Sequence, residues 1–453
     1  MDASKPRPGY LRLSPEAEPL TGRRLVGLAR SSFGFRGLTL CMNLVTGIFV
    51  ARLLGTDGRG EYAVIVALPF GIGWLIKNGC REAVAYHQAR HPEDAGQLLS
   101  TWLLLLVPLG LVGIGFAELL LPLLFNAQSE HAVSLARIFI PALFFILLDD
   151  LLNQGILLGD HDFRYYNLVQ FVQPAIIAVL FVVAWAAGIF SVAIALSAWA
   201  VSSTLVLSWS LGRVLRRHGI ARPSASLARR TFWFGFRAHG TALGQNVNFN
   251  LDLMLIPAFV GASSIGEYSV ASNLAAVVVY TAGLIGAFVL PAASRFRETA
   301  QKTVVQSLHA SLLAGILLAV PLAALGSLAI RVVYGGAFSA SYPLLLLLLP
   351  GAVLFAAAPT LIGGINAANR PFTASIPQMT GAILTVAGLI VFLPLGGSTA
   401  AAIVSTAAYT VVFTLALFIY QRVSGAPWGA FLPRYPRLTR QIAVEAVIGR
   451  RSG

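Results

Sequence analysis

Residues 54–62 read LGTDGRGEY and residues 260–268 read VGASSIGEY, so an apolar-Gly pair and a Gly-Glu-Tyr triplet recur at identical spacing. Residues 33–36 and 234–237 both read FGFR, which is a second pair of copies. The offset between copies is 206 for the first pair and 201 for the second, a drift that small insertions would cause. A repeat of this length predicts two related structural units within one chain.

The composition places both units in a membrane. Of the 453 residues, 57% are hydrophobic and only 11% are charged, whereas soluble domains carry about 25% charged residues. Because a membrane-spanning helix needs about 20 apolar residues, this apolar content is enough for about twelve spans. Helices are expected because an open strand would leave backbone groups unpaired in lipid. An ordinary soluble enzyme is therefore excluded.

Apolar runs separated by polar turns give the boundaries. They predict spans at residues 31–54, 61–79, 98–125, 132–158, 165–187, 190–212, 231–259, 265–291, 304–328, 343–367, 372–395 and 398–420. The predicted fold is an all-α integral membrane protein with two pseudo-symmetric lobes of six transmembrane helices each. The predicted domains are an N-terminal tail (1–30), an N-lobe (31–212), a basic linker (213–230), a C-lobe (231–420) and a basic C-terminal tail (421–453).

The basic residues orient these spans. With both termini and the linker in the cytoplasm, 25 of the 32 Lys and Arg residues fall on the cytoplasmic side, as the positive-inside rule requires. Arg52, Arg59 and Arg331 are assigned to outer loops or edges. The first 22 residues lack an apolar core and predict a cytoplasmic tail rather than a cleaved signal peptide. The net charge of +14 is explained by topology and by contact with anionic lipids, so no nucleic-acid partner is expected.

No motif for catalysis or for a bound cofactor is found. The chain has neither a phosphate loop ending in Lys-Ser or Lys-Thr, nor a His-Glu-x-x-His pair, nor a nucleophile elbow. The two cysteines, Cys41 and Cys80, do not form a metal-ligand pattern. We therefore expect a protein that is not an enzyme and that needs no cofactor or metal.

Charged side chains inside spans are the first candidates for a substrate site, because such burial is costly and marks function by default. Arg36 and Arg237 occupy matched places in the two repeats and are expected to face one shared central cavity. Lys77 and Arg81, at the end of the second span, add positive charge. Guanidinium and ammonium groups fit a phosphate-bearing ligand. The alternative is that all four side chains extend to the cytoplasmic headgroups.

Polar residues without positive charge form a second set. Asn43 lies in the first span, and Asn246, Asn250 and Asp252 lie on a polar run of the seventh. The amides are candidates for binding sugar hydroxyls, or equally for interhelical packing. Asp252 is the candidate for sensing Na⁺ or H⁺, since a bare carboxylate in a span needs a partner. Asp149 and Asp150 are adjacent on the fourth span, where one is expected to pair with a cation.

These residues resemble a known family. The runs Ala51–Gly55 and Gly58–Ala63 look like the junction of the first two helices in polysaccharide-export flippases. In the second lobe, Leu251–Ile256 and Gly266–Ala271 look like that family's seventh and eighth helices. The family is the polysaccharide/oligosaccharide branch of the multidrug/oligosaccharidyl-lipid/polysaccharide (MOP) flippase superfamily, which includes the multidrug MATE transporters. The resemblance covers about residues 28 to 420.

The resemblance implies a MATE/MOP-like fold and a flippase that moves polyprenyl-pyrophosphate-linked oligosaccharides across the bacterial inner membrane for polysaccharide export, by alternating access. It implies that Arg36 and Arg237, and also Lys77 and Arg81, meet the pyrophosphate, and that Asp252 couples a cation. Glycosyltransferases or a glycan polymerase are expected partners. One alternative is a multidrug/cation antiporter of the same fold, and another is an integral membrane transferase or polymerase acting on lipid-linked sugars.

Overall fold

The computed structural model describes residues 22–287, 289 and 300–432, and all their regular elements are helices. The predicted tails lie outside this range over residues 1–21 and 433–453. The long helices are α1 (Gly22–Ile76), α3 (Ala95–Leu124), α6 (Phe163–Ala186), α7 (Val192–His218), α8 (Ala225–Leu255), α9 (Ala262–Ala287), α11 (Ala300–Val333), α12 (Ser341–Ala367) and α13 (Pro371–Ser424). The shorter ones are α2 (Cys80–Arg90), α4 (Glu130–Phe139) and α5 (Leu143–Leu151), with the π-helical turn η3 (Leu152–Leu157) after α5.

Nine of the described helices are long and apolar enough to cross a membrane. Two of them are hairpins, because α1 is broken at Gly55 (φ 68°, ψ −168°) and α13 at Gly397 (φ 52°, ψ −136°). Both backbone conformations are open to glycine and strained for other residues. Counting each hairpin as two crossings, and adding the more polar α8, gives the predicted architecture of about twelve spans.

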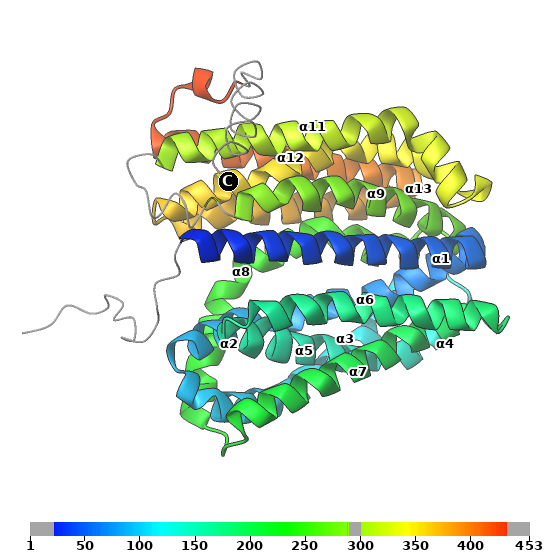
Figure 1. The fold of residues 1–453 in the computed structure, drawn as a ribbon. Coiled ribbons are helices and arrows are strands. Elements are labelled where there is room, and N and C mark those ends of the chain that lie inside the picture. The colour runs from blue at the N-terminus through cyan, green and yellow to red at the C-terminus, as the bar shows by residue number, and fades with distance from the viewer. Residues whose placement is uncertain (1–21, 288, 290–299, 433–453) are drawn as a thin grey trace, which may run out of the picture.

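The helices form two groups, visible in Figure 1 as an upper and a lower bundle. We call α1–α7 the N-lobe and α8–α13 the C-lobe. The first part of α1 lies between the bundles, where it contacts α9 of the C-lobe and α6 of its own lobe. We call the end of the molecule at which α1 turns, near Gly55, the Gly55 end. The opposite end, with α2 and the α7–α8 connection, is the α2 end.

At the Gly55 end the lobes meet through the repeated motif itself. A Cβ at Gly60 would lie 1.8 Å from the Ala262 backbone oxygen, and one at Gly266 would lie 2.1 Å from the Thr56 oxygen. The two contacts are related by the repeat, since 56 and 60 correspond to 262 and 266. Glycine lets two helix backbones approach this closely, which strengthens packing in a membrane. The repeat predicted from sequence thus produces a two-fold-like contact between the lobes.

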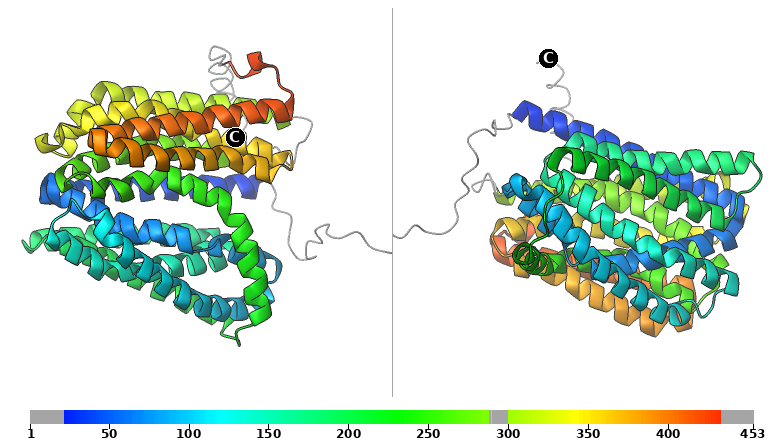
Figure 2. Two further views of the ribbon diagram at one scale, coloured as in Figure 1. Left: turned by 180° about the vertical axis from the view of Figure 1, so that it is seen from behind. Right: turned by 90° about the horizontal axis from the view of Figure 1, so that it is seen from below.

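At the α2 end this symmetry is absent. Gly235, in the second FGFR copy, packs against the N-lobe, where its added Cβ would lie 2.4 Å from the Asn78 backbone oxygen. Gly34, its counterpart in the first copy, has nothing within 4 Å of the corresponding position. Figures 1 and 2 show the reason: the first part of α8 runs across the ends of the other helices, and only its later part runs beside the C-lobe helices.

Three local predictions differ from the structure. The predicted linker 213–230 is helical at both ends, because α7 continues to His218 and α8 begins at Ala225. The predicted fourth span, 132–158, is built from α4, α5 and the turns that follow each of them. The short helix α2 was not predicted, because it is too polar to register as a span and too short to show a clear period.

Candidate functional site

A polar pocket of about 410 Å³ lies inside the bundle, towards the α2 end. It is lined by Phe70, Trp74, Lys77, Arg81, Phe145, Ile146, Asp149, Asp150, Gln154, Tyr166, Gln173, Trp199, Ser203, Val206, Leu207 and Asn246. We call it the Lys77 pocket. Its described lining belongs to the N-lobe except for Asn246, which α8 of the C-lobe contributes. Two cations, two carboxyl groups and several amides and aromatic rings therefore share one interior space.

The Lys77 pocket contains a buried ion pair whose two residues come from different segments of the chain. Lys77 Nζ lies 3.0 Å from Asp150 Oδ2, with the two side chains 8% and 9% exposed. Lys77 follows the end of α1, and Asp150 lies in the last turn of α5. A buried pair of this kind is held because each ion would be strongly destabilised alone. The ion pair confirms that one of the adjacent aspartates pairs with a cation, and it shows that Lys77 does not extend to the headgroups.

The neighbouring carboxyl group of Asp149 has neutral partners. Asn153 donates to its Oδ1 at 2.7 Å, and Gln154 donates to its Oδ2 at 3.4 Å. Both donors stand on the π-helical turn η3, whose extra residue per turn brings successive amides towards one carboxyl group. Tyr166 of α6 in turn donates to Gln154 at 3.0 Å. Such π turns occur often at functional sites, and this one orients the polar wall of the pocket.

The first part of α8 packs on the N-lobe beside this pocket. Asn78 Nδ2 donates to the Phe232 carbonyl at 3.1 Å, and Trp102 Nε1 donates to Thr231 Oγ1 at 3.2 Å. His239 Nε2 lies 2.8 Å from the Trp74 carbonyl. Further along, Asn248 of the same helix binds the C-lobe through Gln378 and Thr385 of α13. One helix thus connects the two lobes across the α2 end.

The predicted site residues are only partly brought together. Lys77, Arg81 and Asn246 line the Lys77 pocket. Arg237 is exposed and lines an open surface pocket with Ser226, Arg229, Arg230 and Trp233. The described part of that surface pocket shares no residue with the Lys77 pocket. Arg237 precedes the region where α8 joins the C-lobe, which places it at the α2 end. The side chains of Arg36 and Asn250 lie outside the described ones.

Asp252 lies in the C-lobe, away from the Lys77 pocket, and is 2% exposed. Its carboxyl group accepts hydrogen bonds from the Tyr268 hydroxyl, from the Leu253 backbone at 2.8 Å and from Ser405 Oγ at 3.5 Å. Tyr268 is on α9 and Ser405 on α13, so three helices converge on one carboxylate. Its partners are all neutral, and in the described part of the chain no cation lies within ion-pair distance of it.

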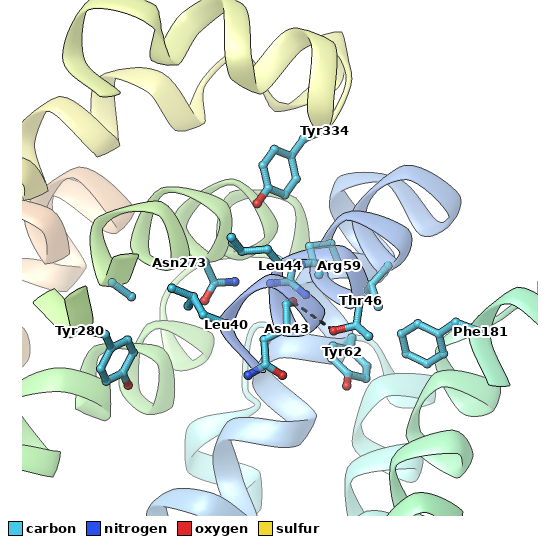
Figure 3. Close-up of a pocket in the computed structure, with 13 residues that line it drawn as sticks. Leu40, Asn43, Leu44, Thr46, Arg59, Tyr62, Phe181, Asn273, Tyr280 and Tyr334 are labelled. Atoms are coloured by element: carbon cyan, nitrogen blue, oxygen red, sulfur yellow. Dashed lines mark hydrogen bonds between the residues drawn. The ribbon is translucent and has the colours of Figure 1, made fainter. Parts of the chain in front are cut away.

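A second pocket, of about 320 Å³, lies nearer the Gly55 end and is formed by both lobes (Figure 3). Asn43, Arg59 and Tyr62 of α1 line it, together with Asn273 and Tyr280 of α9 and with Tyr334 after α11. Asn43 is a predicted site residue, whereas Arg59 was counted only among the outer loops and edges. Arg59 follows the Gly55 break of α1, is 6% exposed, and its side chain lines this pocket.

These features define a multi-pass helical membrane protein with polar pockets inside and between two related lobes. Three solved structures share this fold. A structure of "Lipid II flippase MurJ, inward closed conformation" matches with a TM-score of 0.75 and 17% identity, over 93% of each chain. An inward-facing multidrug resistance MATE family transporter of the MOP superfamily matches with a TM-score of 0.65 and 18% identity, over 86% of this chain and 95% of that one. An outward-facing MATE transporter gives 0.57 and 17%, over 88% and 95%.

The sequence identifies the family. Residues 31–297 match the family described as "Polysaccharide biosynthesis protein". This stretch is more than half of the chain, so the protein belongs to the polysaccharide biosynthesis protein family. Among curated protein sequences none gives a significant match. The polysaccharide family that the sequence resembles is thereby confirmed, and the solved structures confirm the predicted MATE/MOP-like fold.

Proposed function

We propose that this protein is a flippase that moves polyprenyl-pyrophosphate-linked oligosaccharides across the bacterial inner membrane by alternating access. Membership of the polysaccharide biosynthesis family supports a glycan as the transported group, and the MurJ-like fold supports a substrate that is linked to a lipid. The observation that carries the proposal is the Lys77 pocket, a polar space within the helical bundle that is lined by two cations, the buried Lys77 and the exposed Arg81. The polyprenyl tail stays in the bilayer while the polar head passes between the lobes.

The chemistry of the Lys77 pocket suits such a head group. Arg81 offers a planar guanidinium fork that matches phosphate oxygens, and Lys77 supplies a second positive charge. The amides of Gln173 and Asn246 can donate to and accept from sugar hydroxyls. Because Lys77 is already paired with Asp150, a bound phosphate competes with that carboxylate for the ammonium group. When the substrate binds or leaves, the Lys77 ammonium group then exchanges one anionic partner for another and is never left as an unpaired buried charge.

Arg237 has a different role in this proposal. With Arg229 and Arg230 it forms an exposed basic surface at the α2 end. Basic residues near an anionic membrane surface each attract negative groups by about 1 kcal/mol. We assign this surface to drawing the pyrophosphate head towards the Lys77 pocket. Arg36 stays a candidate for the pyrophosphate on the sequence repeat alone, since its side chain lies outside the described ones.

Asp252 is proposed to couple transport to a cation gradient. Its carboxyl group is buried and receives hydrogen bonds from α9 and α13, so protonation or Na⁺ binding there changes the contacts among three C-lobe helices. Asp252→Asn is expected to lower gradient-dependent transport without loss of membrane insertion, and Tyr268→Phe to lower it less because the carboxylate remains. Equal transport by Asp252→Asn and the wild type across Na⁺ and pH gradients would contradict the coupling role and leave Asp252 with a role in helix packing only.

Export in living cells tests the substrate site. We expect Arg81→Ala to reduce surface glycan by about 10-fold to 100-fold, because a charge-assisted hydrogen bond contributes about 1.5–3 kcal/mol. Arg81→Lys should recover part of the export, since the charge remains but the fork is lost. Arg216→Ala, which removes an exposed arginine of α7, is the matched control and should export normally. Normal export by a well-expressed Arg81→Ala variant contradicts the assignment.

A multidrug/cation antiporter is the second candidate, and Asp149 is the feature that favours it. This carboxyl group lines the Lys77 pocket and accepts hydrogen bonds from the amides of Asn153 and Gln154, so it offers an acceptor for a cationic drug. Ethidium efflux distinguishes the two functions. An antiporter lowers ethidium accumulation in a manner that Asp149→Asn abolishes, whereas a glycan flippase leaves accumulation unchanged. The connecting segments at the Gly55 end, such as 187–191, are too short to hold a catalytic domain, which disfavours a transferase or polymerase.

A further inference from the structure

Arg59 is a buried cation that does not line the Lys77 pocket. The side chain follows the glycine break of α1 and lies inside the bundle at 6% exposure. Its Nε donates to Ser269 Oγ of α9 at 3.1 Å. Within the described residues no carboxylate lies within ion-pair distance of its guanidinium. A buried charge with a single neutral partner is unfavourable unless a ligand or a water-filled space completes its surroundings.

The surroundings of Arg59 are a space able to hold such a ligand. The second pocket, which we call the Arg59 pocket, has a volume of about 320 Å³ and is walled by both lobes. Figure 3 shows the side chains of Tyr62, Tyr334 and Asn43 gathered around Arg59, with Asn273 across the pocket. Phenol hydroxyls and amides donate hydrogen bonds to phosphate oxygens and exchange them with sugar hydroxyls. Among its described lining residues the pocket therefore has one cation, several neutral donors and no carboxylate.

The charge balance separates the two pockets. In the Lys77 pocket two cations face Asp149 and Asp150, and Lys77 is paired with one of these. In the Arg59 pocket no acidic residue of the described lining balances the positive charge. An anionic head group that leaves the first pocket would meet a more positive one nearer the Gly55 end. The pseudo-symmetric position is occupied by the buried Ile265, so the cation belongs to only one of the two repeats.

We propose that Arg59 binds the pyrophosphate of the lipid-linked substrate in a second, outer site between the lobes, which receives the head group after the Lys77 pocket. This inference rests on the proposed flippase function. The ligand chemistry is a phosphate group on a lipid, and two sources exist: the polyprenyl pyrophosphate carrier and the anionic phospholipid of the bilayer. The proposal commits to the pyrophosphate.

Protection of a cysteine from a thiol reagent tests the site directly. Asn273 is exposed and lines the Arg59 pocket, so Asn273→Cys places a reactive thiol there in a Cys41→Ser background of the full chain. The protein is held in phosphatidylcholine nanodiscs and labelled with a maleimide. Farnesyl pyrophosphate is the probe, farnesol is the uncharged comparison, and short-chain phosphatidylglycerol represents the bilayer lipid. We expect protection by farnesyl pyrophosphate and none by the other two.

Variants then assign the protection to Arg59. Arg59→Gln should require at least about 10-fold more farnesyl pyrophosphate, as expected for the loss of a hydrogen bond to a charged group. Arg59→Lys should need an intermediate amount because the ammonium lacks the bidentate fork. Arg331→Gln removes an exposed arginine at the same end and should be protected as the wild type is. Protection of Arg59→Gln at the wild-type concentration overturns the proposal, as does protection by phosphatidylglycerol alone.

Two outcomes keep the result interpretable. If Arg59→Gln is not recovered in folded form, protection of Arg59→Lys at the wild-type concentration overturns the site instead. The proposed flippase function fails separately, when the wild-type protein does not export lipid-linked glycan. In that event protection that depends on Arg59 would still establish a pyrophosphate site, so the two failures are distinguishable.

Discussion

The ion pair between Lys77 and Asp150 carries the main electrostatic interaction of the Lys77 pocket. Both side chains are buried, and they come from segments separated by 73 residues of sequence. From the sequence, Lys77 was a candidate for binding substrate, and one of the two adjacent aspartates was expected to pair with a cation. The sequence did not indicate that these two residues pair with each other. The contact between them depends on how α5 packs against the end of α1. This tertiary packing cannot be predicted from the sequence around either residue.

This pair makes a stability prediction. Lys77→Ala or Asp150→Ala should each destabilise the protein by about 3–5 kcal/mol, because the remaining partner is left as an uncompensated buried charge. The double variant should be less destabilised than the sum of the two single variants. Chemical or thermal unfolding in detergent measures all three. Additive losses would mean that the two charges do not interact.

His87 on α2, outside the membrane-spanning helices, gives a pH prediction. Burial lowers the pKa of His87 from 6.5, although its hydrogen bond to Asp94 Oδ2 at 3.2 Å and that residue's charge act in the opposite direction. The unfolded chain therefore binds a proton first as the pH falls. Stability should be retained above pH 6.5 and should decrease as the pH drops from 6.5 towards the lower pKa of the folded state.

The measurement is the melting temperature of the wild type and of His87→Gln between about pH 7.5 and about pH 5.5, where imidazoles titrate. His87→Gln should show a smaller acid-induced decrease than the wild type, and His131→Gln, which removes an exposed histidine of α4, should follow the wild type. An identical pH dependence for His87→Gln and the wild type would exclude His87 as its source.

Arg59 shows which residues sequence reasoning misses. Its place in the motif LGTDGRGEY, in a polar stretch between two apolar runs, put it among the outer loops or edges and not among the candidate site residues. The glycine break at Gly55 is tight, however, and the helix resumes early enough to turn Arg59 inward. The signal available in the sequence is the mismatch between the repeats, because Ile265 occupies the matched position. Searching for matched charges, such as Arg36 and Arg237, passes over a charge present in one copy only.

At the scale of elements, apolar length predicted most of the helices well, and the two hairpin helices match four predicted spans. The exception is α8. Its residues from 231 onward were predicted to cross the membrane, but residues 231–239 contact the N-lobe at the α2 end and residues from 244 onward contact α13. Its arginines and exposed aromatic side chains suit a membrane interface as well as a span. Composition alone does not separate these two placements.

The close contact of α8 with the N-lobe predicts a glycine-dependent closure. Gly235→Ala should open the α2 end, because the new methyl group would lie 2.4 Å from the Asn78 backbone oxygen. Cys80 is a native reporter at this contact, being a free thiol that is 0% exposed. In a Cys41→Ser background, Gly235→Ala should increase the rate of maleimide labelling of Cys80 several-fold.

Gly212→Ala on α7 is the matched control, since nothing lies within 4 Å of the Cβ it would add. It should leave Cys80 unlabelled over the same time. If Gly235→Ala and Gly212→Ala label alike, the backbone contact between Gly235 and Asn78 does not close this end of the molecule.

At the scale of the whole molecule, the two ends differ in symmetry. The Gly55 end is joined by reciprocal contacts between repeat copies, whereas the α2 end is bridged by one helix of the C-lobe. Two lobes with a two-fold-like contact at one end can rock about it, as parallel repeats in transporters do. The repeat could be predicted from the sequence because its motif recurs. The asymmetry could not be predicted, because α8 changes direction without a proline or a helix break.

This arrangement predicts the topology. Reporter fusions at residues 220 and 425 should both report the cytoplasm, because the twelve-span assignment of the sequence puts 25 of the 32 basic residues on that side. Residue 220 lies in the connection between α7 and α8, and residue 425 follows α13 directly. A periplasmic signal from either fusion would contradict the span assignment.

Transport by the purified protein tests the central proposal most directly. The protein is reconstituted in vesicles that contain a fluorescent polyprenyl-pyrophosphate-linked disaccharide, and an impermeant quencher measures the fraction of label that changes leaflet. We predict movement above that in protein-free vesicles, reduced about 10-fold or more by Arg81→Ala and unchanged by the exposed-residue control Arg216→Ala. Movement no faster than in protein-free vesicles, or equal movement by folded Arg81→Ala and the wild type, would contradict a flippase that holds its substrate in the Lys77 pocket.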